Sequence, residues 1–261
     1  MKISIRALLI ATGIVSFLLW VIVVLGGAIR EQRNRVNCSN QMRHLALAIM
    51  NYESAHQKLP MAVEIGPDGK PWHSWRVAIS PFLESNSFAN SYDQREPWNG
   101  PNNSSHTYEY NYYATNYCSC PSDQDKRGNL KISTVVVCGN ETMFPPDRQV
   151  ALSEVTDGLE NTIILAESVN SDVLFAEPGD LNFSTMSFQV NDLSKPSISS
   201  WHFLQRGPFG KRVRGANVVF ADGDCYFMTE EIAVKELKAL LTIAGGENIT
   251  RQQLIDRGVL R

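Results

Sequence analysis

The chain has 261 residues, a formal net charge of -3 and a sequence pI of about 6.0. Proteins that bind nucleic acid through its phosphates carry a basic surface, so this composition gives no reason to expect a nucleic-acid partner. The length is sufficient for a membrane segment followed by one domain with its own core.

The first predicted element is a membrane anchor. Residues 7–29 carry no charged side chain. As a helix they span about 34 Å, enough to cross a hydrocarbon core of about 30 Å. A cleaved signal peptide is the alternative, because Gly26-Gly27-Ala28 offers small residues for cleavage, but its apolar region is normally only about 7–15 residues long. We therefore predict that residues 7–29 contact membrane lipid.

The remainder of the chain is predicted to be one extracytoplasmic domain. The anchor is assigned to residues 1–29 and the α+β body to residues 30–261. Positive charges nearly balance across the anchor, but a long body crosses the membrane largely regardless of flanking charge. We expect the body outside the cytoplasmic membrane.

A second helical segment continues from the anchor. Between residues 30 and 58 apolar side chains recur at alternating spacings of four and three, as expected for a helix with one buried seam, and Pro60 is expected to end it. The seam consists of Cys38, Met42, Leu45, Ile49 and Tyr52. We expect it to pack against a sheet.

The middle of the chain has weaker signals. Residues 66–71 form a turn cluster, and residues 74–84 are typical of a short helix or strand with large apolar anchors. Residues 86–116 have no periodicity but are rich in tyrosine, so we predict irregular surface structure with short elements rather than disorder.

The second half is predicted to be β structure. Residues 132–138 and 161–167 are β-branched runs, and two further strands flank Asp222-Gly223, where we expect a hairpin with a type I′ turn. A helix is expected from 230 to about 243, capped by Thr229.

No catalytic arrangement is evident in the sequence. The histidines are isolated and no nucleophile motif is present; they are His44, His56, His73, His106 and His202. His202 is expected to make a structural hydrogen bond. Phosphate-loop and dinucleotide fingerprints are also missing, so we expect no enzyme activity and no cofactor.

Metal binding is not predicted either. The cysteines fit no zinc spacing, and either a disulfide of Cys138 with Cys118 or Cys120 or buried free thiols would account for them. Asp222 and Asp224 could contribute to a calcium site, but we interpret them as turn residues because the sequence has no EF-hand loop.

The segment 206–214 carries four basic residues together with glycine and proline. We interpret it as a solvated loop. The alternative is a docking patch for an acidic partner or a cell-surface polysaccharide.

Several blocks resemble one bacterial family. The helix Arg35-Val-Asn-Cys-Ser-Asn-Gln, the pair Leu59-Pro60, and later blocks keep their order. The later blocks are Ser74-Trp75-Arg76-Val77, Pro81-Phe82-Leu83-Glu84, Glu96-Pro97-Trp98-Asn99, Cys120-Pro121-Ser122-Asp123, Thr156-Asp157-Gly158, Asn161-Thr162-Ile163, Glu167, Phe220-Ala221-Asp222-Gly223, Leu237–Thr242 and Gly245-Gly246-Glu247. Together they resemble the proteins with domain of unknown function 1559.

The resemblance implies a pilin-like N-terminal helix similar to that of the major pseudopilin of type II secretion. This chain differs from type IV prepilins because Gly13 is followed by no acidic fifth residue. It also differs from the family because His202 precedes Asp222 by twenty residues rather than about ten, so residues 203–214 look like an insertion.

We therefore predict an α+β protein in which a long N-terminal helix packs on an antiparallel sheet, as in pilins. The predicted function is that of a membrane-anchored, pseudopilin-like structural or interaction protein that contacts protein partners or other copies of itself. The alternative is a carbohydrate- or solute-binding module, motivated by Trp72, Trp75, Trp98 and the tyrosines between 108 and 117.

Overall fold

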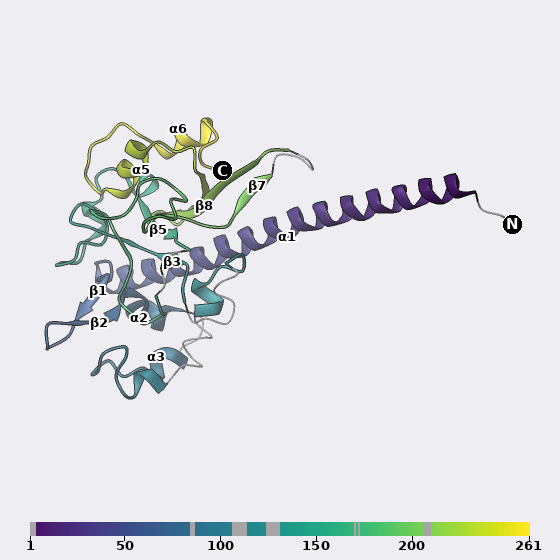
Figure 1. The fold of residues 1–261 in the computed structure, drawn as a ribbon. Coiled ribbons are helices and arrows are strands. Elements are labelled where there is room, and N and C mark those ends of the chain that lie inside the picture. Colours follow the sequence, from purple (N-terminus) through teal and green to yellow (C-terminus); the bar gives the residue numbers. More distant parts are fainter. Residues whose placement is uncertain are drawn as a thin grey trace.

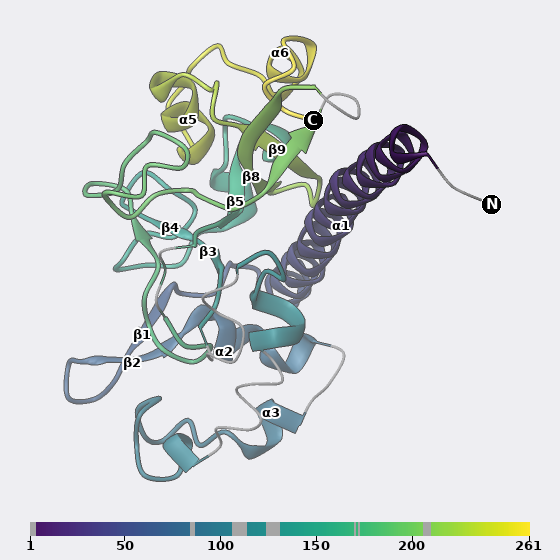
Figure 2. The same cartoon turned by 45° about the vertical axis from the view of Figure 1, so that its right-hand side comes forward.

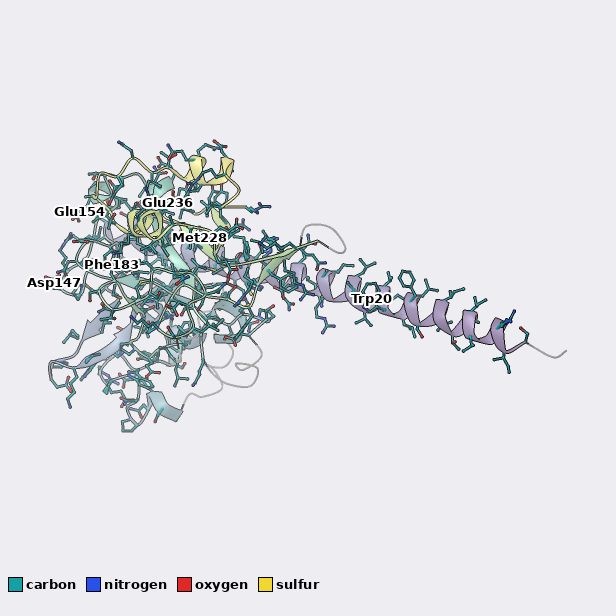
Figure 3. The ribbon with its side chains drawn as sticks, turned by 45° about the horizontal axis from the view of Figure 1, so that its top comes forward. Trp20, Asp147, Glu154, Phe183, Met228 and Glu236 are labelled. Carbon is teal, nitrogen blue, oxygen red and sulfur yellow. The ribbon has the colours of Figure 1, made fainter. Side chains whose placement is uncertain are left out.

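The computed structural model describes residues 4–83, 87–105, 114–123, 131–169, 171, 173–205 and 210–261. A long helix, α1, extends from the body of the protein, and its N-terminal half stands clear of every other element (Figure 1). Trp20 lies on this projecting part (Figure 3).

Helix α1 runs without interruption from Ile5 to His56. Its first half is apolar all round and exposed, with Leu18 53% exposed, whereas the predicted seam is buried from Cys38 to Ile49. The helix ends four residues before Pro60 because Gln57 adopts a positive φ of 62° and its N–H caps the Glu53 carbonyl at 2.6 Å.

The predicted antiparallel sheet is present. Its order is β3-β5-β8-β7, and β9 also pairs with β8; every pairing in it is antiparallel. The strands are β3 (Thr134–Val135), β5 (Ile163–Glu167), β7 (Phe203–Gln205), β8 (Arg212–Phe220) and β9 (Cys225–Thr229). Helix α1 packs against this sheet, and α5 (Val234–Leu241) lies on its other side (Figure 2). The expected α+β fold is confirmed.

Shorter elements surround this framework. They are β1 (Val63–Ile65), β2 (Pro71–Ser74), α2 (Trp75–Ile79), η1 (Ser80–Phe82), α3 (Ser87–Ser91), η2 (Asn103–Ser105), the π-helical turn η3 (Ala114–Cys118), β4 (Val137–Cys138), η5 (Leu152–Glu154), η6 (Leu159–Asn161), β6 (Leu181–Asn182) and α6 (Arg251–Asp256). Strands β1 and β2 form a hairpin, and β4 and β6 pair in parallel.

A buried ion pair fastens α2 to the segment before β6. Arg76 Nη2 lies 2.7 Å from Asp180 Oδ1, and both side chains have no exposed surface. Asp180 Oδ1 also accepts from the Trp75 indole at 3.2 Å and the Val136 N–H at 2.9 Å. Ser74, the last residue of β2, caps α2 by accepting a hydrogen bond from the Arg76 N–H, and the network holds this helical turn against the core.

Three local predictions are wrong. The run 132–138 is divided between β3 and β4, which pair with different strands. The hairpin at Asp222-Gly223 is confirmed, but Asp222 has no positive φ; only Gly223 does, at 93°. With the Gly223 N–H bonded to the Phe220 carbonyl, this is a type I turn followed by a left-handed glycine.

The third error concerns the helix predicted from 230. Thr229 is the last residue of β9, where its N–H bonds to the Val259 carbonyl, and α5 begins only at Val234. Thr229 stays in the sheet because it pairs with Gly215 of β8 on one side, while its N–H is satisfied by Val259 on the other.

The basic segment 206–214 is only partly a loop. Residues 206–209 lie outside the described residues, whereas Arg212 to Arg214 begin β8 and pair with β7. In a β-strand, successive side chains point to opposite faces, so the two arginines can be exposed while Val213 between them is buried. The segment that looked like an insertion therefore lengthens a β-hairpin.

Candidate metal centre

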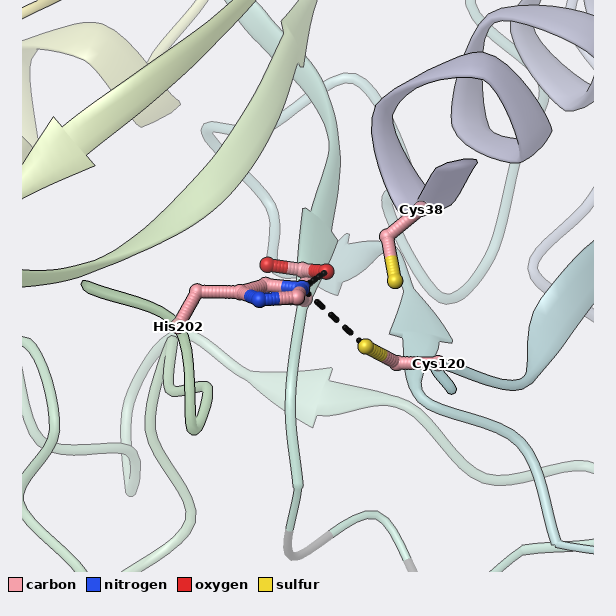
Figure 4. Close-up of side chains that lie close together, drawn as sticks. Cys38, Cys120 and His202 are labelled. Carbon is pink, nitrogen blue, oxygen red and sulfur yellow. Dashed lines mark hydrogen bonds and ion pairs between the residues drawn. The ribbon is translucent and has the colours of Figure 1, made fainter. Parts of the chain in front are cut away.

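Four buried side chains from distant parts of the sequence meet between α1 and the sheet. Cys38, Cys120, Glu167 and His202 place one sulfur, nitrogen or oxygen atom each so that all four atoms lie within 4.8 Å of one another. The exposed fraction is at most 8% for any of the four. Figure 4 shows Cys38 and Cys120 directing their sulfur atoms toward each other and His202 facing Cys120.

Each residue is held by the element that carries it. Cys38 is on the buried seam of α1, and Glu167 is the last residue of β5. Cys120 follows η3, and its N–H donates to Ser133 Oγ at 2.8 Å. His202 directly precedes β7, and its N–H donates to Ser200 Oγ at 3.0 Å. The four positions depend on how these elements pack together.

The His202 ring is fixed on both sides. Its Nε2 lies 3.1 Å from Cys120 Sγ and 3.3 Å from Glu167 Oε1, and its Nδ1 lies 2.5 Å from Glu31 Oε1. Ser122 Oγ donates to the other Glu31 oxygen at 2.8 Å. The structural hydrogen bond predicted for His202 is therefore present.

Glu167 uses its two oxygens differently. Oε2 accepts from the Asn217 N–H at 2.7 Å. Oε1 is buried and accepts no hydrogen bond from the described residues, although His202 Nε2 is within ion-pair distance. A buried carboxylate oxygen without a hydrogen bond is costly, so this atom is a candidate ligand position.

The titrating groups of the cluster affect one another. Burial opposes a charged His202, but the negative charge of the Glu167 carboxylate and the close contacts with Cys120, Glu167 and Glu31 outweigh it and raise the pKa of His202 to about 12. The hydrogen bond from Cys38 lowers the pKa of Cys120. Burial acts in the opposite direction, and the neighbouring His202 lowers this pKa further. Burial, reinforced by Cys120, strongly raises the pKa of Cys38. The cluster thus favours negative charge on one sulfur.

This arrangement offers two kinds of chemistry. Two sulfurs, an imidazole nitrogen and a carboxylate oxygen are a ligand set for a thiophilic metal ion. A cysteine beside a histidine and a carboxylate is also how nucleophilic sites are built. A nucleophile must reach a substrate, and Cys120 is only 8% exposed.

A surface hollow lies beside residues that flank this cluster. Its volume is about 320 Å³, and its lining includes Glu31, Pro121, Ser122, Trp201 and Phe203, but none of the four clustered residues. It reaches the residues next to Cys120 and His202 in the sequence. Because Cys120 does not line this hollow, a molecule bound there would not contact its sulfur atom.

The predicted disulfide is not formed. All five cysteines are free, and the alternative of buried free thiols is found for Cys38, Cys118 and Cys120. Cys138 lies in β4 and is half-buried. The cysteine that approaches Cys120 is Cys38, eighty-two positions earlier in the numbering.

The acidic turn residues have other partners. Arg251 lies 2.7 Å from Asp222 and 3.4 Å from Asp224, so one guanidinium forms ion pairs with both carboxylates. The Asp157 carboxylate accepts from the N–H groups of Gly245 and Gly246 at 2.7 and 3.0 Å. These residues act as turn and tethering residues, as expected.

The described histidines other than His202, and the three tryptophans of the carbohydrate-binding alternative, lie outside this cluster. His44 and His56 are exposed on α1, and His73 is buried against the Tyr92 hydroxyl at 2.6 Å. His106 lies outside the described residues. Trp75 is fully buried.

Trp72 and Trp98 are half-buried, and Trp98 packs against the core. Tyr117 is buried, and the tyrosines at 108, 110, 112 and 113 lie outside the described residues. The three tryptophans that motivated the carbohydrate-binding alternative therefore form no exposed row of rings.

Sequence spacing alone did not reveal the cluster, because its ligands come from four separate segments. A signal was nevertheless present. Cys38, Cys120 and Glu167 each stand in a block that carries the family resemblance, and His202 is the histidine with the altered spacing to Asp222.

The sequence of this chain matches the model of one protein family. The model for a protein of unknown function (DUF1559) matches residues 27–141 and 137–235, well over half of the chain. The chain belongs to the DUF1559 family. All four clustered residues of this DUF1559 protein lie inside the matched segments. Neither the curated proteins nor the solved structures contain a significant match.

The N-terminal helix of this DUF1559 protein is compatible with membrane anchoring. Within the described residues, α1 is the one helix long and apolar enough to cross a membrane, and its most apolar window has a mean hydropathy of 2.6 and is 0% buried. A signal sequence has the same properties.

Proposed function

We propose that this DUF1559 protein is a membrane-anchored, pseudopilin-like structural or interaction protein of the cell envelope. The observation that carries the proposal is the continuity of α1. The first half of this helix is apolar and exposed, and one face of the second half is buried against the body. A signal peptide removed at Ala28 would separate these halves. A retained anchor uses both.

The second half of α1 supports a role as a rigid stalk. Met42, Leu45 and Ile49 are each no more than 1% exposed, and they belong to the same apolar core as the sheet strands. A helix fixed in this way transmits the orientation of the anchor to the body. The proposal places the body outside the cytoplasm, where it contacts protein partners or other copies of the chain.

The proposal includes no catalytic step. The one described cluster with a nucleophile, a base and a carboxylate has its sulfur atoms buried. The pilin route of processing is not part of the proposal either, because the residues after Gly13 contain no acid at the fifth position.

Membrane fractionation with intact-mass analysis of the N-terminus tests this function. We expect the complete chain in the membrane fraction after an alkaline carbonate wash. A soluble product starting near Ile29 would establish a signal peptide and overturn the anchor. A species cut at Gly13 would restore prepilin processing, and cross-linking in intact cells would then report self-association.

A second candidate function is solute binding at a surface hollow beside β4 and β6. Its volume is about 570 Å³, and Phe183, Phe188 and Lys238 contribute to its lining. Phe183 and Phe188 pack edge to face at 5.0 Å, and Lys238 lies over the Phe188 ring. Aromatic and polar groups together are typical of sugar-binding surfaces. Titration with envelope polysaccharide fragments, comparing the chain with Phe183→Ala, tests this candidate.

A further inference from the structure

We propose that Cys38, Cys120, His202 and Glu167 bind one zinc ion that fastens α1 to the sheet. The inference does not depend on the membrane anchor, because all four residues lie after residue 29. It starts from the four candidate ligand atoms that lie within 4.8 Å of one another.

The distances around His202 resemble those of a tetrahedral site. With Zn–N and Zn–O bonds of about 2.0–2.2 Å, neighbouring nitrogen and oxygen ligands are about 3.3–3.5 Å apart. His202 Nε2 and Glu167 Oε1 are 3.3 Å apart. Zn–S bonds of about 2.3 Å put sulfur about 3.5 Å from the nitrogen. Cys120 Sγ is at 3.1 Å, so binding requires only a small outward shift.

Glu167 Oε1 is the strongest single indication of a ligand. Glu167 is 2% exposed, and its Oε2 is held by the Asn217 N–H. Oε1 accepts no regular hydrogen bond from the described residues and has only the contact with His202 Nε2 at 3.3 Å. One oxygen of this carboxylate lies within 4.8 Å of the other three ligand atoms. A metal ion would satisfy it, whereas a protein core otherwise leaves few such atoms unpaired.

The surroundings of His202 match those of a metal-binding histidine. Such a histidine normally donates its second N–H to a carboxylate, which fixes the tautomer and the ring orientation. Here Nδ1 lies 2.5 Å from Glu31 Oε1, Ser122 Oγ donates to Glu31 Oε2, and Asn34 donates to Ser122 Oγ at 3.1 Å. Because the hydrogen bond with Glu31 occupies Nδ1, the His202 atom left to coordinate a metal ion is Nε2.

Zinc binding would exchange protons for metal. The ion accepts electron pairs from two thiolates, the neutral His202 Nε2 and the Glu167 carboxylate, and protons held by the thiols and by Nε2 leave to water. Nδ1 keeps its proton and donates it to Glu31. Arg35, whose charge interacts with Glu31 and Glu167, offsets the remaining negative charge.

The ligand types determine the kind of metal and its role. Two thiolates and an imidazole favour zinc over calcium or magnesium, which prefer oxygen. Four protein ligands leave no open position, as in structural rather than catalytic zinc sites. Cys38 lies nine residues beyond Ile29, about 14 Å along the helix. The ion would therefore join stalk and body close to the end of the apolar segment.

Metal analysis of the full chain, purified in detergent without chelator, tests the site. We expect one zinc per chain by mass spectrometry, lost on chelation and restored by titration with ZnCl₂ against a competing indicator. Cobalt substitution should give thiolate-to-metal charge transfer and the visible bands of a tetrahedral ion.

Variants assign the ligands. Cys38→Ser, Cys120→Ser and Glu167→Gln should each lower zinc affinity by at least tenfold, and each cysteine variant should weaken the cobalt charge-transfer band. Cys118→Ser is the matched control, because Cys118 is also buried and lies two residues from Cys120 but outside the cluster. Glu31→Gln should keep the stoichiometry and reduce affinity by about 10–100-fold.

Two results obtained with the wild-type chain would overturn the proposal. One is a wild-type chain that takes up no zinc or cobalt after reduction, which is a measurement that no variant's folding can affect. The other is a chain isolated from the envelope with a Cys38–Cys120 disulfide, seen as the loss of two hydrogens in the intact mass, since that bond consumes both thiolates. Equal metal affinity in Cys118→Ser and Cys120→Ser would exclude the assigned ligands.

Discussion

The two halves of α1 share one backbone conformation but have different surroundings. Leu18 and its neighbours contact no other described part of the protein and are exposed. Around Leu45, the side chains that face the sheet are buried. The first half is apolar on all sides and the second on one seam only. Helical pattern and the surroundings of a helix are therefore separate signals, since the first half of α1 is suited to hydrocarbon and the second half to a protein core.

The largest expected effect comes from charging the first half. Val15→Arg, Leu18→Arg and Ile22→Arg together should make membrane insertion less favourable by about 7.5–10.5 kcal/mol, because each arginine at mid-bilayer costs about 2.5–3.5 kcal/mol. We expect the chain to leave the carbonate-resistant fraction while the melting temperature of the body stays unchanged. Persistent membrane retention would contradict the anchor.

The second effect comes from the buried half. Leu45→Ala should lower the free energy of unfolding by about 2–5 kcal/mol, because it removes a fully buried side chain from the core. Leu47→Ala is the matched control, since Leu47 is on the same helix but 58% exposed. Denaturant unfolding in detergent measures both. Equal losses in the two variants would show that the seam is not packed as described.

A smaller effect tests the junction between the halves. At Gly26 and Gly27 an added Cβ would meet nothing within 4 Å. Alanine should therefore stabilise the helix by up to about 1 kcal/mol per site. Amide hydrogen exchange around residues 26–31 should slow by about fivefold in Gly27→Ala. Unchanged or faster exchange would mean that α1 bends at this junction.

The smallest effect concerns the end of the helix. Gln57 has a φ of 62°, a left-handed conformation that glycine adopts without strain. Gln57→Gly should raise the free energy of unfolding by about 0.5–1 kcal/mol, measured by the same denaturant unfolding. Gln57→Val, which is β-branched, should lower it and serves as the opposite control.

Much of the fold followed from local pattern. The apolar first half of α1, its buried seam and the hairpin at Asp222-Gly223 could be predicted from sequence, because each depends on residues close in sequence. The run 132–138 was misjudged because pairing decides strands: Thr134 faces Glu167, whereas Val137 faces Leu181. The type of turn at Gly223 and the start of α5 also depended on neighbouring strands.

The site followed much less from the sequence. Cys38, Cys120 and His202 are residue types that bind metal ions, but sequence motifs for metal sites have ligands only a few residues apart. Cys38 and His202 are separated by most of the chain. Their approach depends on α1 packing across β5 and β8, which no local pattern encodes.

By itself, the sequence determined the secondary-structure type of the long elements, the apolar character of residues 7–29 and membership of the DUF1559 family. Tertiary structure alone decided which side chains meet. The physical reason is range: helix periodicity and turn chemistry act over a few residues, whereas burial brings Cys38, Cys120, Glu167 and His202 together through contacts between separate elements.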